Sequence, residues 1–323
     1  MSRIVYLDIA KAICMILVVI GHYSPMTAPE YWQQLIRVIY TFHMPLFMFT
    51  SGLIYILSNN TPPLRCYKRF VVKKTHRLAI PYIAVSIILI TVKIFLGKNG
   101  ENVDHPCDIY SYFELFYRPA AGFFLWFLYV LYVIFLIVPL FKTKKSRLYL
   151  ALASLILYFI PIDLPHEFCL FEFKNHFCFF MCGVLCGECK DIIKIQGKSL
   201  LIPLLLLAVN VFATIWGYSN MGVVKMLLAL NGIFCMLSIS RYIENHWSSA
   251  LTNIIMASFT IYLFHTAFEG FTKSIVYRVA EFVPLPFILQ AVVIVVGGII
   301  LPVWLDKFVL RKYRVTRYLF GLK

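Results

Sequence analysis

Near its start the chain has a mostly apolar run at residues 4–22, which reads IVYLDIAKAICMILVVIGH. This is close to the length of about 20 residues that a helix needs to cross the hydrocarbon core of a bilayer. Similar runs recur to the end of the 323-residue chain, in which 61% of residues are hydrophobic and 14% charged. Soluble domains average roughly 45–50% apolar residues. The sequence therefore predicts an all-α polytopic membrane protein, with residues 1–323 forming a single domain in the lipid bilayer.

Loops rich in lysine and arginine divide the apolar runs into about ten predicted transmembrane helices. Alternate connections, such as residues 58–78, are basic, and the positive-inside rule places them in the cytoplasm. The 97–120 connection lacks this excess and is expected outside, so both termini are predicted to be cytoplasmic. The short run 148–162 and the junction near Arg241 are weakly defined, and eight or eleven spans stay open. The predicted spans are 4–24, 35–57, 79–96, 121–141, 148–162, 174–189, 199–217, 223–240, 250–269 and 285–305.

The net charge of +15 raises the question of an anionic partner. Because the basic residues lie in short loops between apolar runs, we expect anionic lipid or a phosphorylated small molecule and no nucleic acid. Nine cysteines are present, and four of them follow one face of a predicted helix beside two glycines. Ligands strung along one helix cannot converge on one ion. We predict small-residue helix packing there and no metal site, the residues being Cys178, Cys182, Gly183, Cys186, Gly187 and Cys189.

Three polar side chains interrupt the first apolar run: Asp8, Lys11 and His22. A charge inside a membrane span needs a reason, because leaving it in lipid costs several kcal/mol. At about 100° per residue, the step from Lys11 to His22 returns to nearly the same helix face, and Asp8 lies close to it. One interpretation is a functional stripe through the membrane. The other is that Asp8 and Lys11 neutralise each other at i and i+3 while His22 caps the helix at the interface.

Two further histidines lie in later spans. His43, in the segment FHMPLF at residues 42–47, enters the membrane at nearly the predicted depth of His22, so these two imidazoles are expected to be able to meet. Pro45 kinks the helix that carries it. His265 lies in the outer part of a span near the C-terminus, and we interpret it as a satisfied core or interfacial histidine.

Lys74 and Arg77 stand one helical turn apart where the second cytoplasmic loop meets the membrane. Such a pair suits the phosphates of a bound ligand. Ordinary positive-inside charge is the alternative, although it explains Arg77, which abuts an apolar run, less well.

Taken in order and spacing, these motifs resemble the membrane acyltransferase family 3, and within it the fucose 4-O-acetylase-like branch. The likeness includes the basic-x10-His pattern of Lys11 and His22, the His43 segment, and the RLAIPY segment that begins at Arg77. The resemblance implies that the chain forms one integral-membrane domain, that it lies in a bacterial inner membrane, and that it transfers an acyl group. The acyl group is expected to be acetyl. The donor would be cytoplasmic acetyl-CoA, and the acceptor a carbohydrate hydroxyl on a surface polysaccharide or lipid-linked sugar.

The resemblance also implies roles for particular residues. His22 corresponds to the essential histidine of the family motif, and Lys11 to its basic partner. An arginine pair in the family corresponds to Lys74 and Arg77, although lysine lacks the bidentate fork of arginine. Lys11 or His43 would stabilise the developing negative charge. Whether His22 acts as a base or becomes acylated stays open, as do acetyl versus succinyl and the oligomeric state.

Intramembrane Asp, Lys and His residues also build substrate pathways, so a polytopic transporter of a glycan or small molecule is the rival hypothesis. The two halves of the chain show no inverted or parallel repeat of the kind common in transporters, which disfavours it. A non-catalytic partner of a polysaccharide synthase is a third hypothesis.

Overall fold

The computed structural model describes residues 4–58, 66–98, 105–189, 197, 199–247 and 251–322. All regular structure within these ranges is helical. Eight helical stretches in the described residues are long and apolar enough to cross a membrane. The predicted all-α membrane class is therefore confirmed. The eight stretches are Val5–His22, Glu30–Leu57, Tyr67–Lys98, Phe123–Leu140, Glu167–Glu188, Gly222–Trp247, Thr252–Phe282 and Phe287–Leu310.

The helices have the following bounds. The longer ones are α1 (Val5–His22), α2 (Glu30–Leu57), α4 (Ile80–Lys98), α6 (Trp126–Ile137), α7 (Lys144–Phe159), α8 (Leu170–Glu188), α9 (Leu201–Ile215), α10 (Gly222–Trp247), α11 (Thr252–Phe282) and α12 (Phe287–Leu305). The shorter ones are α3 (Tyr67–Lys74), η2 (Thr75–Ala79), α5 (Ser111–Glu114), η3 (Phe123–Leu125), η4 (Val138–Leu140), η5 (Glu167–Cys169), η6 (Tyr218–Asn220), η7 (Asp306–Leu310) and α13 (Arg314–Leu319).

Two of the ten predicted spans correspond to short helices. The run 148–162 becomes α7, with 16 residues, and the run 199–217 becomes α9, with 15. The start of α7 is fixed by a capping box in which Thr143 Oγ1 accepts from the backbone N–H of Ser146 at 3.0 Å, and Ser146 Oγ accepts from that of Thr143 at 3.1 Å. The first turn of α7 is therefore basic rather than apolar. The count of ten and the cytoplasmic termini stay predictions, and residues 59–65, 99–104 and 190–196 of the predicted loops lie outside the described residues.

The chain divides into two compact units. The first comprises residues 1–58 and 182–306, and the second residues 59–181 and 307–323. The boundary between them falls within α8. The prediction of one domain over the whole chain stays a prediction.

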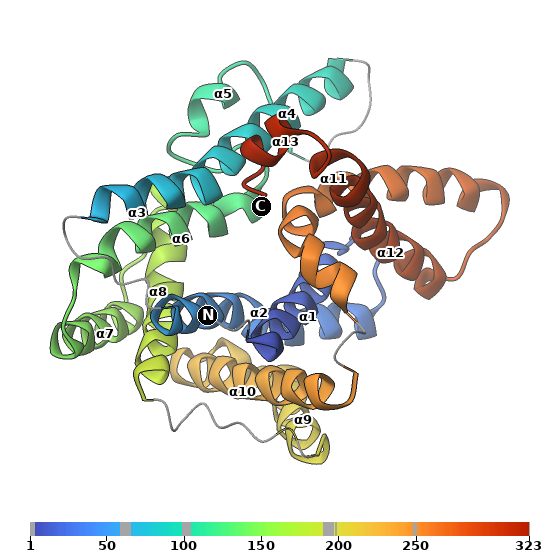
Figure 1. Cartoon of the computed structure of the whole chain (residues 1–323). Coiled ribbons are helices and arrows are strands. Elements are labelled where there is room, and N and C mark those ends of the chain that lie inside the picture. Colours follow the sequence, from blue (N-terminus) through green and yellow to red (C-terminus); the bar gives the residue numbers. More distant parts are fainter. Residues whose placement is uncertain are drawn as a thin grey trace. The chain divides into compact units, whose positions relative to one another are not determined.

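In the first unit, α1 packs against α2, α10, α11 and α12. Figure 1 shows α1 and α2, in blue, lying beside α10, with α9 at the end of α10. Leu7, Ala10, Ala12 and Val19 of α1 are fully buried, because small and aliphatic side chains on several faces of this helix meet neighbouring helices. The body of α1 is therefore held on several sides.

Glycines allow the end of α8 to approach α2 closely. A Cβ atom added at Gly183 would lie 2.0 Å from the carbonyl oxygen of Phe49, and one added at Gly187 would lie 2.1 Å from Ile56 Cγ2. These distances confirm close helix packing at Gly183 and Gly187, the two glycines of the predicted small-residue face.

In the second unit, α3, η2 and α4 form one continuous helical stretch that packs on α6, and α13 packs on α4 (Figure 1). The hydroxyl of Tyr67 donates to the carbonyl of Leu136 at 2.7 Å, and the hydroxyls of Thr75 and Tyr132 lie 2.9 Å apart. The segment η2 is a π-helix, a form that occurs often at functional sites.

Candidate functional site

His22 is the last residue of α1, and its surroundings hold the backbone while leaving the side chain exposed. The hydroxyl of Tyr40 donates to the carbonyl of Gly21 at 2.9 Å, and the indole of Trp32 donates to the carbonyl of Tyr23 at 2.7 Å. Carbonyls at a helix C-terminus lack partners within the helix, so both bonds from α2 satisfy groups that would otherwise be left open. His22 is therefore an accessible imidazole on a fixed support.

His265 lies directly against His22. The two ring centroids are 4.9 Å apart with an interplanar angle of 60°, and His265 is 0% exposed. Its Nδ1 lies 2.9 Å from the carbonyl oxygen of Tyr262 and 3.1 Å from that of Ile261. Because carbonyls only accept, Nδ1 carries the hydrogen and Nε2 keeps its lone pair in the neutral ring. The structure thus confirms that His265 is a core histidine and also adds it to the candidate site, which the sequence interpretation did not.

His43 contacts Tyr40, the residue whose hydroxyl donates to the carbonyl of Gly21 at the end of α1. It is buried in α2, and its ring stacks on that of Tyr40 with centroids 4.9 Å apart. Its Nδ1 donates to the carbonyl of Ile39 at 3.0 Å, which leaves Nε2 as an acceptor. The ring that the structure places against His22 is that of His265, whereas the sequence interpretation considered His43. A direct role for His43 stays a prediction.

Lys11 lies on the same helix as His22, eleven residues earlier, and hence about 16 Å away along the axis at 1.5 Å per residue. Its ammonium is 3.7 Å from Asp8 Oδ1, and the two side chains are 31% and 25% exposed. The predicted i, i+3 ion pair is therefore confirmed. At this distance Lys11 cannot touch an atom bonded to the His22 ring, so any part it has in chemistry is separate from that of the imidazole.

Glu269 is a buried acidic residue that the sequence interpretation missed. It follows His265 by one turn of α11 and is 7% exposed, and its Oε1 has no hydrogen-bond partner within the described part of the chain. A Cβ added at Gly298 of α12 would lie 2.6 Å from Glu269 Cγ and 3.0 Å from Val19 Cγ1. Gly298 therefore leaves the room that the carboxyl group occupies beside α1. An ionisable group buried in a span is expensive and calls for a functional reason.

Lys74 and Arg77 belong to the second unit and have different surroundings. The Lys74 ammonium lies 3.3 Å from the ring centroid of Phe135 and 5.4 Å from that of Phe70, a cation–π arrangement. Arg77 lies within the π-helix η2 and is exposed. Of the two residues, Arg77 is the exposed one, and phosphate binding by either residue stays a prediction.

The C-terminal segment packs against the helical stretch that carries Arg77. Tyr318 meets the ring of His76 edge-on with centroids 4.8 Å apart. Gly321 has a φ of +60°, and a Cβ added there would lie 3.1 Å and 3.2 Å from the carbonyl oxygens of His76 and Arg77. A glycine is required here both by the left-handed backbone and by the close approach.

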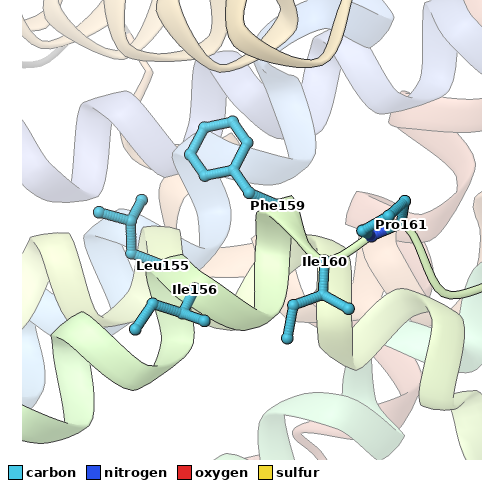
Figure 2. A pocket seen from close by; sticks show the side chains of 5 residues that line it. All are labelled: Leu155, Ile156, Phe159, Ile160 and Pro161. Carbon is cyan, nitrogen blue, oxygen red and sulfur yellow. The ribbon is translucent and has the colours of Figure 1, made fainter.

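A surface hollow in the second unit is lined by side chains near the end of α7. Figure 2 shows Leu155, Ile156, Phe159, Ile160 and Pro161 around it. All five are apolar and offer neither a base nor a ligand for charge. This hollow is not the candidate site.

These observations define a polytopic α-helical membrane protein with an exposed imidazole at the end of its first span and a buried imidazole behind it. Residues 4–307 match the family model described as an acyltransferase domain, and the chain belongs to this family, the family-3 acyltransferases. Comparison with curated proteins and with solved structures gives no match. The prediction of a membrane acyltransferase is confirmed at the level of the family.

Replacement of His265 by phenylalanine is expected to lower acyl transfer by about 10- to 100-fold, the usual effect of removing a partner that orients or supports a functional group. Phenylalanine fills most of the ring volume, so packing against His22 is largely kept while the ring nitrogens of His265 are lost. The measurement is transferase activity per folded enzyme, with the thermal unfolding temperature as the control. Activity equal to that of the wild type in a correctly folded variant would remove His265 from the site.

Proposed function

We propose that the protein transfers an acetyl group from acetyl-CoA to a hydroxyl of a surface polysaccharide or lipid-linked sugar in a bacterial inner membrane, as in the fucose 4-O-acetylase-like branch. The proposal is supported by membership of the family and by the motifs that resemble this branch. One observation carries it: the exposed ring of His22 lies 4.9 Å from the buried ring of His265.

The chemistry follows from the weakness of an alcohol as a nucleophile at neutral pH. His22 accepts the proton of the sugar hydroxyl while the hydroxyl oxygen bonds to the thioester carbonyl carbon. The carbon–sulfur bond then breaks, and the departing thiolate takes the proton back from His22. The neutral His265, with a lone pair on Nε2, is suited to stabilise the imidazolium that forms in between. In this scheme His22 is a base rather than an acylated nucleophile.

Arg77 is the residue proposed to bind the donor. Arg77 is an exposed residue, and its guanidinium is permanently charged and shaped for bidentate contact with phosphate. Acetyl-CoA is a co-substrate here, and no step of the scheme requires a metal.

Substitution of Arg77 by alanine is expected to raise the KM for acetyl-CoA by about 10- to 100-fold and to change kcat less, because a contact to phosphate remote from the reacting carbon is mostly uniform binding. Lys73→Ala is the matched control, since Lys73 is an exposed basic residue four positions earlier. Steady-state kinetics in membranes with matched protein levels provide the measurement. An unchanged donor KM in Arg77→Ala would contradict this placement.

The proposed function is tested in cells by deleting the gene and analysing the surface glycans by mass spectrometry. We expect one glycan to lose a single acetyl mass per repeating unit, and the plasmid-borne gene to restore it. A fall in the amount of surface glycan with its acylation unchanged would instead indicate a transporter.

A further inference from the structure

A second histidine with an oriented ring lies far from α1 in sequence, in the segment between α7 and α8 of the second unit. His166 Nδ1 is 2.6 Å from Glu172 Oε1. The His166 side chain is 63% exposed, whereas that of Glu172 is 4% exposed. Because a carboxylate only accepts hydrogen bonds, Nδ1 carries the hydrogen, and the lone pair of Nε2 points away from Glu172 on an exposed ring. This is how a buried acid fixes the tautomer and direction of a functional imidazole.

The backbone beside this pair is strained. Phe168 and Cys169 both have a φ of +53°, a left-handed conformation that residues other than glycine adopt rarely. Hydrogen bonds hold them there: the N–H of Phe168 donates to the carbonyl of Tyr117 at 2.5 Å, and that of Cys169 to the carbonyl of His166 at 3.0 Å. Strain of this kind persists where the surrounding structure enforces it, and it gathers at binding and catalytic sites.

The Glu172 side chain is more deeply buried than a residue needs to be if its role is only to hold the loop in place. Its second oxygen, Oε2, is buried without a hydrogen-bond partner among the described residues. The segment already has other ties, because the Lys174 ammonium donates to the carbonyl of Ile162 at 2.7 Å and the N–H of Phe171 donates to the carbonyl of Pro165 at 3.2 Å. Burying a carboxyl group that is only half satisfied costs free energy, so a benefit other than closing the loop is expected.

Aromatic rings flank the exposed imidazole. Phe123 meets the His166 ring edge-on with centroids 5.9 Å apart, and Phe171 lies 4.9 Å from it. Phe123 is 57% exposed, and Phe168 of the strained turn is 55% exposed. Exposed aromatic faces together with a fixed hydrogen-bond acceptor suit a ligand that has both C–H faces and hydroxyl groups, which is the chemistry of a carbohydrate.

We propose that His166, positioned by Glu172, belongs to a carbohydrate-binding site in which Nε2 accepts a hydrogen bond from a sugar hydroxyl and Phe123 and Phe168 cover an apolar face of the sugar. The proposal rests on the proposed function, in which the acceptor is a carbohydrate. It deepens that function by naming where the acceptor is held. Glu172 is a positioning residue, because it acts through the His166 ring.

Substitutions of His166 can distinguish the role of Nδ1, which bonds to Glu172, from that of Nε2, which is proposed to bind the sugar. In His166→Asn the side-chain amide stands where Nδ1 stood, so it keeps the donor to Glu172 but has no group at the Nε2 position. His166→Ala loses both. The probe is an oligosaccharide prepared from the host's surface glycan and stripped of its ester groups with mild alkali, and its binding to the purified full chain is measured by calorimetry without any acyl donor.

We expect the wild-type protein and the control variant His246→Ala, in which an exposed histidine of α10 is replaced, to bind the oligosaccharide equally. His166→Asn and His166→Ala should both bind it about tenfold more weakly, the effect of losing one hydrogen bond to the ligand. In turnover, His166→Asn should raise the KM for the acceptor and leave that for acetyl-CoA unchanged. Glu172→Gln should raise the acceptor KM less, with an unchanged unfolding temperature.

Two results would overturn the site. In one, His166→Asn matches the wild type while His166→Ala is impaired, which makes the pair a structural tie. In the other, the wild-type protein does not bind the oligosaccharide. Because binding is measured without a donor, a protein that binds the glycan but transfers no acyl group refutes the proposed transfer and leaves the binding site standing.

Discussion

Replacing His22 with alanine should lower acyl transfer by about 10²- to 10⁴-fold, the usual loss when a general base is removed. The imidazole is the group that takes the hydroxyl proton, and neither Lys11, some 16 Å along the helix, nor the fully buried His265 is placed to replace it. The fold should survive, because the side chain is exposed and the backbone around it is held by Tyr40 and Trp32. The measurement is acetyl content of the acceptor glycan, normalised to enzyme level by immunoblot.

His246→Ala is the matched control for this substitution. His246 is likewise an exposed histidine near a helix end, in α10, where its ring stacks on that of Tyr242. The His246→Ala variant should retain full activity. A loss of activity confined to His22→Ala would then result from the position of His22 and not from the removal of any exposed histidine. A His22→Ala protein with nearly normal acetylation would refute the assignment of the base.

Gly183→Ala should strongly destabilise the folded protein and lower its yield. The added Cβ would lie 2.0 Å from the carbonyl oxygen of Phe49 and 2.9 Å from the backbone nitrogen of Leu53. Both are backbone atoms, which cannot move aside as a side chain does, so the backbones of α8 and α2 must move apart at this point. Overpacking a core costs typically 1–3 kcal/mol and sometimes more, against a total stability of about 5–15 kcal/mol. The yield of monodisperse protein in detergent measures the effect.

Gly270→Ala provides the control for this second prediction. Gly270 lies inside α11, and a Cβ added there would meet no atom within 4 Å. Alanine is favoured over glycine in a helix by about 1 kcal/mol, so this variant should be at least as stable as the wild type. The close packing would be contradicted if Gly183→Ala and Gly270→Ala unfolded at the same temperature.

The fold class was predictable because a membrane span is a run of consecutive apolar residues and can be recognised without knowledge of tertiary contacts. The length and apolarity of the runs indicated the eight long helical stretches. The start of α7 was not predicted, because it depends on the Thr143 capping box, and the hydropathy of the run from 148 does not register a cap. The predicted span that ends at residue 269 was also too short, because α11 continues to Phe282. Glu269 therefore lies in the interior of this helix and not at its end.

The candidate site was predictable only where it lies on one helix. The stripe of Asp8, Lys11 and His22 follows from helical periodicity, and so does the ion pair between the first two. The contact between His22 and His265 joins residues more than two hundred positions apart, and periodicity along either helix carries no information about it. Likewise His166 lies in a segment without regular structure, and only the fold reveals that a buried carboxyl group orients it.

The most direct test of acyl transfer by His22 uses purified protein reconstituted in lipid vesicles, with acetyl-CoA labelled in its acetyl group and the ester-free surface oligosaccharide as acceptor. The account predicts that label appears in an alkali-labile ester on the oligosaccharide, with one free thiol released per ester. It also predicts that His22→Ala protein, inserted to the same extent, forms this ester at least about 100 times more slowly. Equal rates of ester formation by the two proteins would contradict the account, as would movement of unmodified oligosaccharide across the vesicle membrane without any ester.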